Sequence, residues 1–287
     1  MKTPNGVQRF APAKVNLSLR VLGKRPDGYH EIETVMVPIS LGDVVEVSLG
    51  GRGITFDSNA NTLPRDAGNL AVRAASRFMQ EAGLKKGVRI GIGKVIPLGA
   101  GLGGGSSNAA AVLTALNGLT GKPLGKVALS RLGLSLGADV PFFLGGRPAL
   151  ARGIGERLTA LPPMPETWFV LVNPGFEVST AWAYERLRGA LTTLPPHPKV
   201  PPISRDWSNL GASLRNDLEA VTLPRYPVLH RLKERLVGLG AVSALVSGSG
   251  PTVFGVFREA SGARRAFEAL RLASNWQVFL ARSLQPA

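Results

Sequence analysis

Five glycines in seven residues, at positions 99–105, run directly into an alanine-rich segment, and this stretch constrains the chain more than any other. Glycine adopts positive φ readily, so successive amide N–H groups can surround an anion. We predict a helix over residues 106–116, whose N-terminus would direct unpaired N–H groups at the same anion. Ser106, Ser107 and Asn108 would supply capping oxygens or phosphate-binding hydroxyls. The stretch 97–105, which we call the first glycine loop, therefore predicts a phosphate site.

Two better-known glycine loops do not fit this stretch. The Walker pattern requires a lysine directly before its serine or threonine, and no lysine precedes Ser106. The dinucleotide pattern G-x-G-x-x-G does occur from Gly99, but it needs an acidic residue about twenty positions later to bind the ribose. No Asp or Glu lies between Glu81 and Asp139, so this interpretation fails as well.

The first glycine loop and the alanines after it, residues 97–109, resemble the ATP-binding loop of the GHMP kinases (galacto-, homoserine, mevalonate and phosphomevalonate kinases). Four further motifs follow the order of that family: Ala-Pro-Ala-Lys-Val-Asn-Leu at 11–17, Arg-Pro-Asp-Gly-Tyr-His-Glu at 25–31, Gly-Ala-Asp-Val-Pro-Phe at 137–142 and Ser-Gly-Ser-Gly-Pro-Thr at 247–252. The first two are similar to the branch that phosphorylates a cytidine-diphospho sugar alcohol. The resemblance covers nearly the whole chain.

The resemblance implies an α+β, two-domain GHMP kinase fold. Residues 1–160 would form the N-terminal ATP-binding domain, related to domain 2 of a ribosomal protein, and residues 161–287 a ferredoxin-like C-terminal domain. The predicted elements of the C-terminal part agree with a ferredoxin-like domain. Helices near 226–239 and 260–272 alternate there with strands at 244–246, 252–256 and 277–281. A proline-rich surface loop is predicted at 194–205.

The implied activity is ATP-dependent phosphorylation of the 2-hydroxyl of 4-diphosphocytidyl-2-C-methyl-D-erythritol, in the non-mevalonate route to isoprenoid precursors. The enzyme would be a cytoplasmic small-molecule kinase, a monomer or weak homodimer. Its magnesium would be carried on ATP, because the region before Asp139 lacks the acidic ligand that several GHMP kinases add there. His30, His197 and His230 have no ligand-like spacing either, so we predict no protein metal site.

Residues 14–21 alternate between apolar and polar, which predicts a half-buried strand. Its polar face carries Lys14, Asn16 and Ser18, and on this pattern alone Lys14 would be an ordinary solvated lysine. The resemblance implies instead that Lys14 contacts the acceptor hydroxyl and the catalytic carboxylate, and that Asn16 binds substrate. Asp139 is the implied general base, although a helix-capping aspartate fits the sequence equally well.

Asp27-Gly28 predicts a hairpin turn, and Tyr29 and His30 follow it into the next strand. A tyrosine ring can stack on a base, and a histidine can both donate and accept hydrogen bonds. The resemblance implies that these two residues read the cytosine, with Tyr184 on the other face of the base. Core packing would explain Tyr184 equally well.

The other implied contacts lie in loops and at the ends of elements. Asn69 is predicted to cap a helix and to lie near the adenine, and Lys94 to reach the nucleotide from a strand end. The second glycine loop, residues 247–250, would line the cleft near the substrate diphosphate. ATP binding is thus assigned to Pro97, Leu98, Gly99, Ala100, Gly101, Leu102, Gly103, Gly104, Gly105, Ser106, Ser107, Asn69 and Lys94, and substrate binding to Asn16, Tyr29, His30, Thr180, Tyr184, Gly248, Ser249 and Gly250.

Composition narrows the alternatives. The formal charge of +15 suits a polyanionic ligand and would equally suit nucleic acid, but the basic residues are scattered and not interleaved with aromatic ones. An RNA-binding protein is therefore the weaker alternative, and a GHMP kinase for another alcohol, such as mevalonate or homoserine, the nearer one. The chain has no cysteine, its first eight residues lack an apolar signal core, and its longest uncharged run, 95–121, is rich in Gly and Ser. We predict no membrane contact.

Overall fold

A computed structural model describes residues 2–3, 6–162, 164–187, 214–272 and 275–285. The predicted loop at 194–205 and His197 lie outside these residues. The chain divides into two compact units that alternate along the sequence: unit 1 is Met1–Ala13, Gly42–Ile96 and Gly103–Gly146, and unit 2 is Lys14–Leu41, Pro97–Leu102 and Arg147–Ala287. The first glycine loop thus passes from unit 2 into unit 1. A domain boundary at residue 160 remains a prediction.

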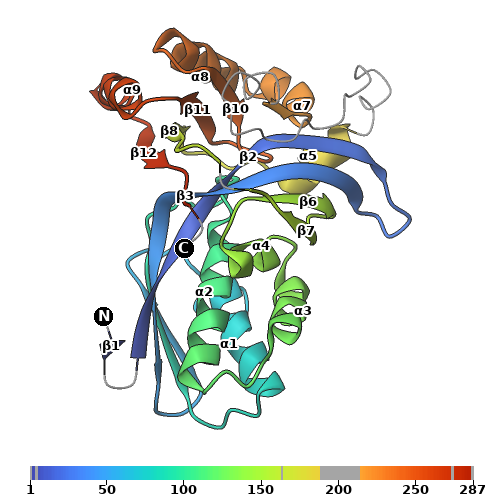
Figure 1. Cartoon of the computed structure of the whole chain (residues 1–287), viewed down its shortest axis with the longest axis vertical. Coiled ribbons are helices and arrows are strands. Elements are labelled where there is room, and N and C mark those ends of the chain that lie inside the picture. Colours follow the sequence, from blue (N-terminus) through green and yellow to red (C-terminus); the bar gives the residue numbers. More distant parts are fainter. Residues whose placement is uncertain (1, 4–5, 163, 188–213, 273–274, 286–287) are drawn as a thin grey trace. The chain divides into compact units, whose positions relative to one another are not determined.

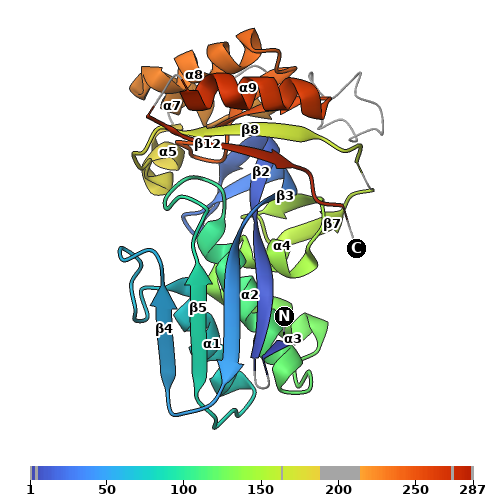
Figure 2. The same ribbon diagram turned by 90° about the vertical axis from the view of Figure 1, so that its left-hand side faces the viewer.

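The strands of unit 1 include parts of two long strands and three shorter strands. They are β1 (Lys2–Thr3), the first part of β2 (Gly6–Lys24), the last part of β3 (His30–Leu49), β4 (Ile54–Ser58) and β5 (Val88–Gly93). β5 pairs antiparallel with β3 and parallel with β4, and Figure 2 shows these three side by side. Alternation explains the local structure, because Val88, Ile90 and Ile92 are buried whereas Arg89 is exposed.

Four helices complete unit 1: α1 (Leu70–Glu81), α2 (Gly104–Leu119), α3 (Lys126–Leu136) and α4 (Val140–Gly145), which lie together in Figure 1. The predicted cap of α1 is confirmed, since Asn69 Oδ1 accepts from the Ala71 N–H at 2.9 Å. The apolar faces of α1 and α2 share one core with β3 and β5, including Phe78, Leu113 and Val45.

The predicted capping by Ser106, Ser107 and Asn108 is wrong. Helix α2 begins at Gly104, two residues before the expected start, and its N-cap is Gly103 in a left-handed conformation (φ +72°) with no side-chain cap. Glycine tolerates that conformation, so the chain needs no capping side chain there. The three polar residues lie inside the first turns of the helix.

Unit 2 contains an antiparallel four-stranded sheet of order β10-β11-β8-β12, formed by β8 (Trp168–Asn173), β10 (Ser243–Val246), β11 (Val253–Phe257) and β12 (Gln277–Arg282). The helices α8 (Pro227–Gly238) and α9 (Ala260–Leu272) pack on this sheet, as Figure 2 shows. Strand, helix, two strands, helix and strand in this order form a ferredoxin-like unit, which confirms the predicted fold class.

The rest of unit 2 surrounds the long strands β2 and β3. It consists of β6 (Ala149–Gly153), β7 (Arg157–Ala160), α5 (Thr180–Leu187), β9 (Arg215–Asn216) and α7 (Glu219–Arg225). β6 pairs with β3 antiparallel, and β9 pairs with β2 parallel, with Leu19 opposite Asn216. A small core of Leu19, Val21, Ala183 and Leu218 joins β2 to α5 and the start of α7. Four of the eight residues predicted to bind substrate lie on these elements and the two long strands: Asn16 on β2, His30 on β3, and Thr180 and Tyr184 on α5.

Candidate functional site

Lys14 and Asn16 form a buried polar cluster on β2. Lys14 Nζ donates to Asn16 Oδ1 at 2.6 Å and to the Gly101 carbonyl at 2.8 Å. Asn16 Nδ2 donates in turn to Thr34 Oγ1 at 2.8 Å. The expectation of a solvated polar face is wrong, because both side chains, with Ser18, are buried. Burying polar and charged side chains costs desolvation free energy, and residues buried in this way typically have a function beyond solubility.

The first glycine loop lies directly on the second. Gly101 has φ of +74°, and a Cβ at this position would lie 2.1 Å from the Ser247 carbonyl oxygen. Ser247 Oγ also donates to the Gly101 carbonyl at 3.0 Å. The predicted need for glycine is therefore confirmed here by both backbone conformation and close approach.

The second glycine loop also lies beside the polar cluster. A Cβ on Gly248 would lie 3.5 Å from Lys14 Nζ and 3.6 Å from Asn16 Oδ1. Ser249 Oγ lies 2.9 Å from Thr180 Oγ1 at the start of α5. The structure thus brings five of the residues predicted for catalysis or substrate binding around one loop of unit 2: Lys14, Asn16, Thr180, Gly248 and Ser249.

The predicted base readers come together in unit 2. The rings of His30 and Tyr184 lie 5.2 Å apart, tilted by 33°. Tyr29 is 61% exposed at the end of the hairpin, and its N–H donates to Asp27 Oδ1 at 3.1 Å. Arg25 hydrogen-bonds to Asp27 as well, and this contact lowers the pKa of the Asp27 carboxyl. The turn that presents Tyr29 is therefore held by a charged pair.

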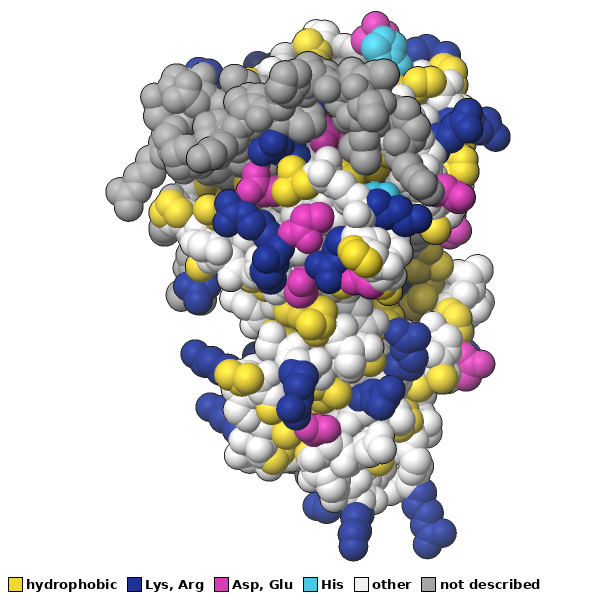
Figure 3. All heavy atoms as spheres, turned by 90° about the vertical axis from the view of Figure 1, so that its right-hand side faces the viewer, with side chains coloured by type: hydrophobic (Ala, Val, Ile, Leu, Met, Phe, Trp, Pro, Cys, Tyr) yellow, Lys and Arg dark blue, Asp and Glu magenta, His cyan; other side chains and the backbone are white. Residues whose placement is uncertain are grey.

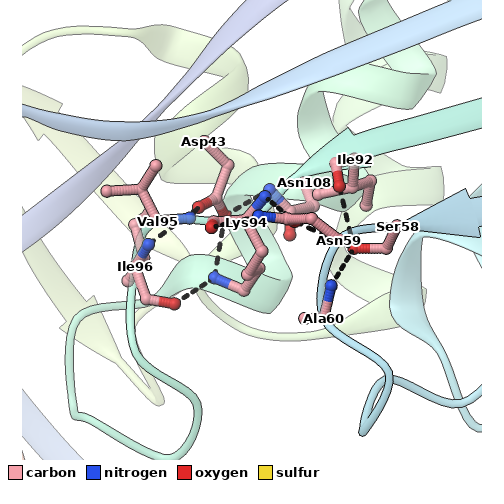
Figure 4. A network of polar contacts seen from close by, with 9 residues as sticks. All are labelled: Asp43, Ser58, Asn59, Ala60, Ile92, Lys94, Val95, Ile96 and Asn108. Carbon is pink, nitrogen blue, oxygen red and sulfur yellow. Dashed lines mark hydrogen bonds and ion pairs between the residues drawn. The ribbon is translucent and has the colours of Figure 1, made fainter.

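In unit 1, Lys94 lies in a network around a carboxylate that sequence reasoning missed (Figure 4). Asp43 accepts from the N–H groups of Val95 and Ile96 at 2.7 and 2.8 Å, from Asn108 Nδ2 at 2.8 Å and from Lys94 Nζ at 2.9 Å. Lys94 also donates to the Ile96 carbonyl. Burial lowers the pKa of Lys94, and Asp43 opposes that shift. Contact of Lys94 with the nucleotide stays a prediction.

Asn59 fixes the other side of the same strand end. Its Oδ1 accepts from the Lys94 N–H at 2.7 Å, and Ser58 Oγ donates to the Ile92 carbonyl at 2.8 Å, as Figure 4 shows. The backbone on either side of Lys94 is therefore tied both to β4 and to Asp43. No pattern in the sequence indicates these contacts, because they join residues 34 positions or more apart.

Two predicted residues at the start of α2 have informative surroundings. Ser107 is buried, and its Oγ has no hydrogen-bond partner among the described residues. Ser106 Oγ lies near Gly137, where a Cβ would be 3.7 Å away. The turn that carries Asp139 therefore adjoins the first turn of this helix.

Asp139 stands at the N-cap position of α4 but makes no side-chain capping bond. The helix-capping interpretation of this residue thus finds no support in the hydrogen bonds of the structure. Asp139 belongs to unit 1 and Lys14 to unit 2, and their pairing stays a prediction.

A polar segment before α7 was missed by sequence reasoning. Asn216 Nδ2 donates to the carbonyls of Val246 and Gly248 at 2.8 and 2.7 Å. Asp217 Oδ2 accepts from the Val21 N–H at 2.9 Å. The only signal in the sequence is the run Arg-Asn-Asp at 215–217 directly before a helical stretch.

Glu219, shortly after this segment, should make the free energy of unfolding depend on pH. Its Oε1 accepts from the Val246 N–H at 2.7 Å, and its carboxylate pairs with Lys233. Burial raises the pKa of Glu219 above its ordinary value of 4.5, although Lys233 opposes the shift. Since the folded pKa exceeds the unfolded one, the contribution of Glu219 to stability is present below the unfolded pKa and lost as pH rises through the folded pKa.

We expect Glu219→Gln to remove this loss. Urea unfolding at a series of pH values from about 4 to 7 should show the wild type becoming less stable relative to the variant as pH rises. The difference between the two proteins cancels the titration of the other carboxylates. Parallel stability profiles of wild type and variant would contradict the assignment.

Within the residues that the structure describes, no group of three or more His, Asp or Glu side chains could hold a metal ion. No helix there is long and apolar enough to cross a membrane. On the face that Figure 3 shows, Lys and Arg side chains are dispersed among other side chains rather than gathered.

Comparisons with known proteins agree with this arrangement. The model of the GHMP kinases N terminal domain matches residues 69–147, and that of the GHMP kinases C terminal domain matches residues 200–274. The chain is 47% identical over 271 residues to the 4-diphosphocytidyl-2-C-methyl-D-erythritol kinase of Syntrophotalea carbinolica, with 94% of this chain and 96% of that protein covered.

Solved structures give the same result. The crystal structure of a 4-(cytidine 5'-diphospho)-2C-methyl-D-erythritol kinase superposes with a TM-score of 0.84 at 41% identity, covering 98% of this chain and 100% of the other. A homoserine kinase from Cytophaga hutchinsonii has a TM-score of 0.73 at 21% identity, with 99% and 96% covered, and so shows the fold alone. The chain therefore belongs to the family of 4-diphosphocytidyl-2-C-methyl-D-erythritol kinases within the GHMP kinases, and it is a small-molecule kinase.

Proposed function

We propose that this kinase transfers the γ-phosphoryl group of ATP to the 2-hydroxyl of 4-diphosphocytidyl-2-C-methyl-D-erythritol. The observation that carries the acceptor is the His30–Tyr184 ring pair, with Tyr29 exposed at the neighbouring turn. An aromatic face and a group that both donates and accepts hydrogen bonds suit a cytosine ring. An acceptor without a base, such as mevalonate or homoserine, would leave these groups without a role.

The phosphates of ATP would be held by backbone amides of the first glycine loop and the N-terminus of α2. The buried hydroxyl of Ser107 has no hydrogen-bond partner in the part of the chain that the structure describes, and this supports the location, because a phosphate oxygen or its metal would satisfy it. Magnesium, when bound to the nucleotide, would neutralise developing charge on the phosphate oxygens. We assign it no carboxylate ligand.

For the chemical step we propose Asp139 as general base and Lys14 as its cationic partner. The acceptor oxygen attacks the γ-phosphorus, the bond to the β–γ bridging oxygen breaks, and ADP leaves. The proton of the hydroxyl passes to the Asp139 carboxylate. An ammonium near both the hydroxyl and that carboxylate would favour their deprotonated forms.

The acceptor is tested by an ADP-release assay with ATP, magnesium and one of three alcohols: the cytidine-diphospho compound, mevalonate or homoserine. We expect turnover only with the first. Tyr184→Ala should raise KM for that acceptor by roughly ten-fold and leave KM for ATP unchanged, since stacking on a base contributes about 1–3 kcal/mol.

Tyr226→Ala is the matched control. Tyr226 also lies in unit 2 and stacks on Phe176 with ring centroids 5.1 Å apart, so its loss removes a comparable aromatic contact. KM for the acceptor should stay near the wild-type value in this variant. Turnover of mevalonate or homoserine, or an equal rise of KM in both variants, would reject the proposed acceptor.

A further inference from the structure

We infer that the second glycine loop holds the first in its nucleotide-binding conformation, and that Ser247 and Asn216 are positioning residues for the nucleoside triphosphate. The inference rests on the proposed phosphate site and adds two residues to it, of which neither is expected to touch the reacting atoms. Every contact that carries it lies within unit 2.

Two donors hold the Gly101 carbonyl in the first glycine loop. It accepts from Ser247 Oγ at 3.0 Å and from Lys14 Nζ at 2.8 Å. The Leu102 carbonyl next to it accepts from the Lys14 N–H at 3.0 Å. A carbonyl with two donors cannot rotate without breaking one of them, so the peptide after Gly101 is fixed in orientation.

Asn216 in turn supports the backbone around Ser247. Asn216 Nδ2 donates to Val246 O and to Gly248 O, the carbonyls on either side of Ser247. Asn216 is buried, and its Oδ1 accepts from the Leu218 N–H at 3.0 Å. The Asn216 side-chain amide thus bridges the two carbonyls on either side of Ser247 and makes three hydrogen bonds in total.

Both supports of the Gly101 peptide begin at strand β2. Asn216 pairs with Leu19 of β2, and the Asp217 N–H donates to the Leu19 carbonyl at 2.9 Å. Lys14 lies on the same strand. The strand therefore supports the Gly101 peptide directly through Lys14 and indirectly through Asn216 and Ser247.

Supporting the first glycine loop in this way should strengthen nucleotide binding. A run of glycines loses more conformational entropy on ordering than any other sequence, and unless the loop is ordered beforehand, that loss weakens nucleotide binding. Fixing one peptide in the middle of the loop removes part of that loss before the ligand arrives. The effect should therefore fall on nucleotide affinity, not on affinity for the acceptor.

The test uses Ser247→Ala and Asn216→Ala in the full-length enzyme. Titration with ADP and magnesium, without acceptor, should show affinity weakened about three- to ten-fold for Ser247→Ala and about ten-fold for Asn216→Ala. Ser247→Ala removes one hydrogen bond to the first glycine loop, and Asn216→Ala removes the two that hold the carbonyls on either side of Ser247. In Ser247→Ala, KM for ATP should rise by a similar factor while KM for the acceptor changes less than about two-fold.

Two matched controls remove a buried hydroxyl or a partly buried amide elsewhere. Ser283 Oγ accepts from the Thr167 N–H at 3.1 Å, and Asn117 bonds Leu124 through both its Oδ1 and its Nδ2. Ser283→Ala and Asn117→Ala should bind ADP as the wild type does. Thermal unfolding followed by circular dichroism identifies any variant whose loss of affinity reflects unfolding.

Unchanged ADP affinity in Ser247→Ala would overturn the inference, and so would an equal loss in Ser283→Ala or a rise confined to KM for the acceptor. Because ADP is titrated without acceptor, the result does not depend on which alcohol is phosphorylated. An error in the proposed acceptor and an error in this inference are therefore distinguishable.

Discussion

Asp139→Asn should lower kcat by about 10²- to 10⁴-fold, the range of a lost general base. Asparagine keeps the size and hydrogen-bonding shape of the side chain but cannot take the proton of the acceptor hydroxyl. The Asp139 side chain makes no capping hydrogen bond to α4, so the substitution removes no helix cap. The loss should appear in kcat, because the groups proposed to hold ATP belong to the glycine loop and α2.

The measurement is steady-state ADP release with wild type and variant, combined with ADP titration. We expect the affinity for ADP to remain within about two-fold of the wild type. Asp66→Asn serves as a matched control, because the Asp66 carboxylate accepts from the Gly68 N–H at 2.9 Å in an exposed loop of the same unit. A large rise in KM for ATP with unchanged kcat would show that Asp139 binds nucleotide or metal rather than the proton.

Local patterns in the sequence predicted the elements of this fold well. The helix expected at 260–272 is α9 with the same bounds, and the cap expected at Asn69 is present. Of the five glycines in the first glycine loop, Gly99, Gly101 and Gly103 have the expected positive φ, whereas Gly104 and Gly105 already belong to α2. Each of these features depends on residues within a few positions of one another, which is the range over which propensity and periodicity carry information.

Contacts between distant segments were not predictable in the same way. The polar face of β2 is buried because Gly101 comes to Lys14 from 87 positions along the chain. Asn108 was expected to cap its own helix, but it donates to Asp43, and Gly103 takes the cap position instead. A single sequence shows which groups need partners, and it does not show which partners the fold supplies.

Asp43→Asn should destabilise the protein by about 3–5 kcal/mol, the cost of breaking a buried ion pair by removing one partner. The Asp43 side chain is fully buried and that of Lys94 is 6% exposed, so water cannot replace the lost charge. An amide oxygen at the Oδ1 position would still accept from Val95 and Ile96, but the NH₂ group would then face the donors of Lys94 and Asn108. The pKa of Lys94, already lowered by burial, should fall further once its countercharge is gone.

Urea unfolding of four proteins tests this: wild type, Asp43→Asn, Lys94→Met and the double variant. The double variant should be more stable than Asp43→Asn alone, because it no longer buries an unpaired ammonium. Glu81→Gln is the control, since Glu81 pairs with Arg131 at 2.9 Å on the surface and its loss should cost about 0–1 kcal/mol. If Asp43→Asn lowered the free energy of unfolding no more than Glu81→Gln does, the Asp43 carboxylate would not be what stabilises the contact between the strand end and α2.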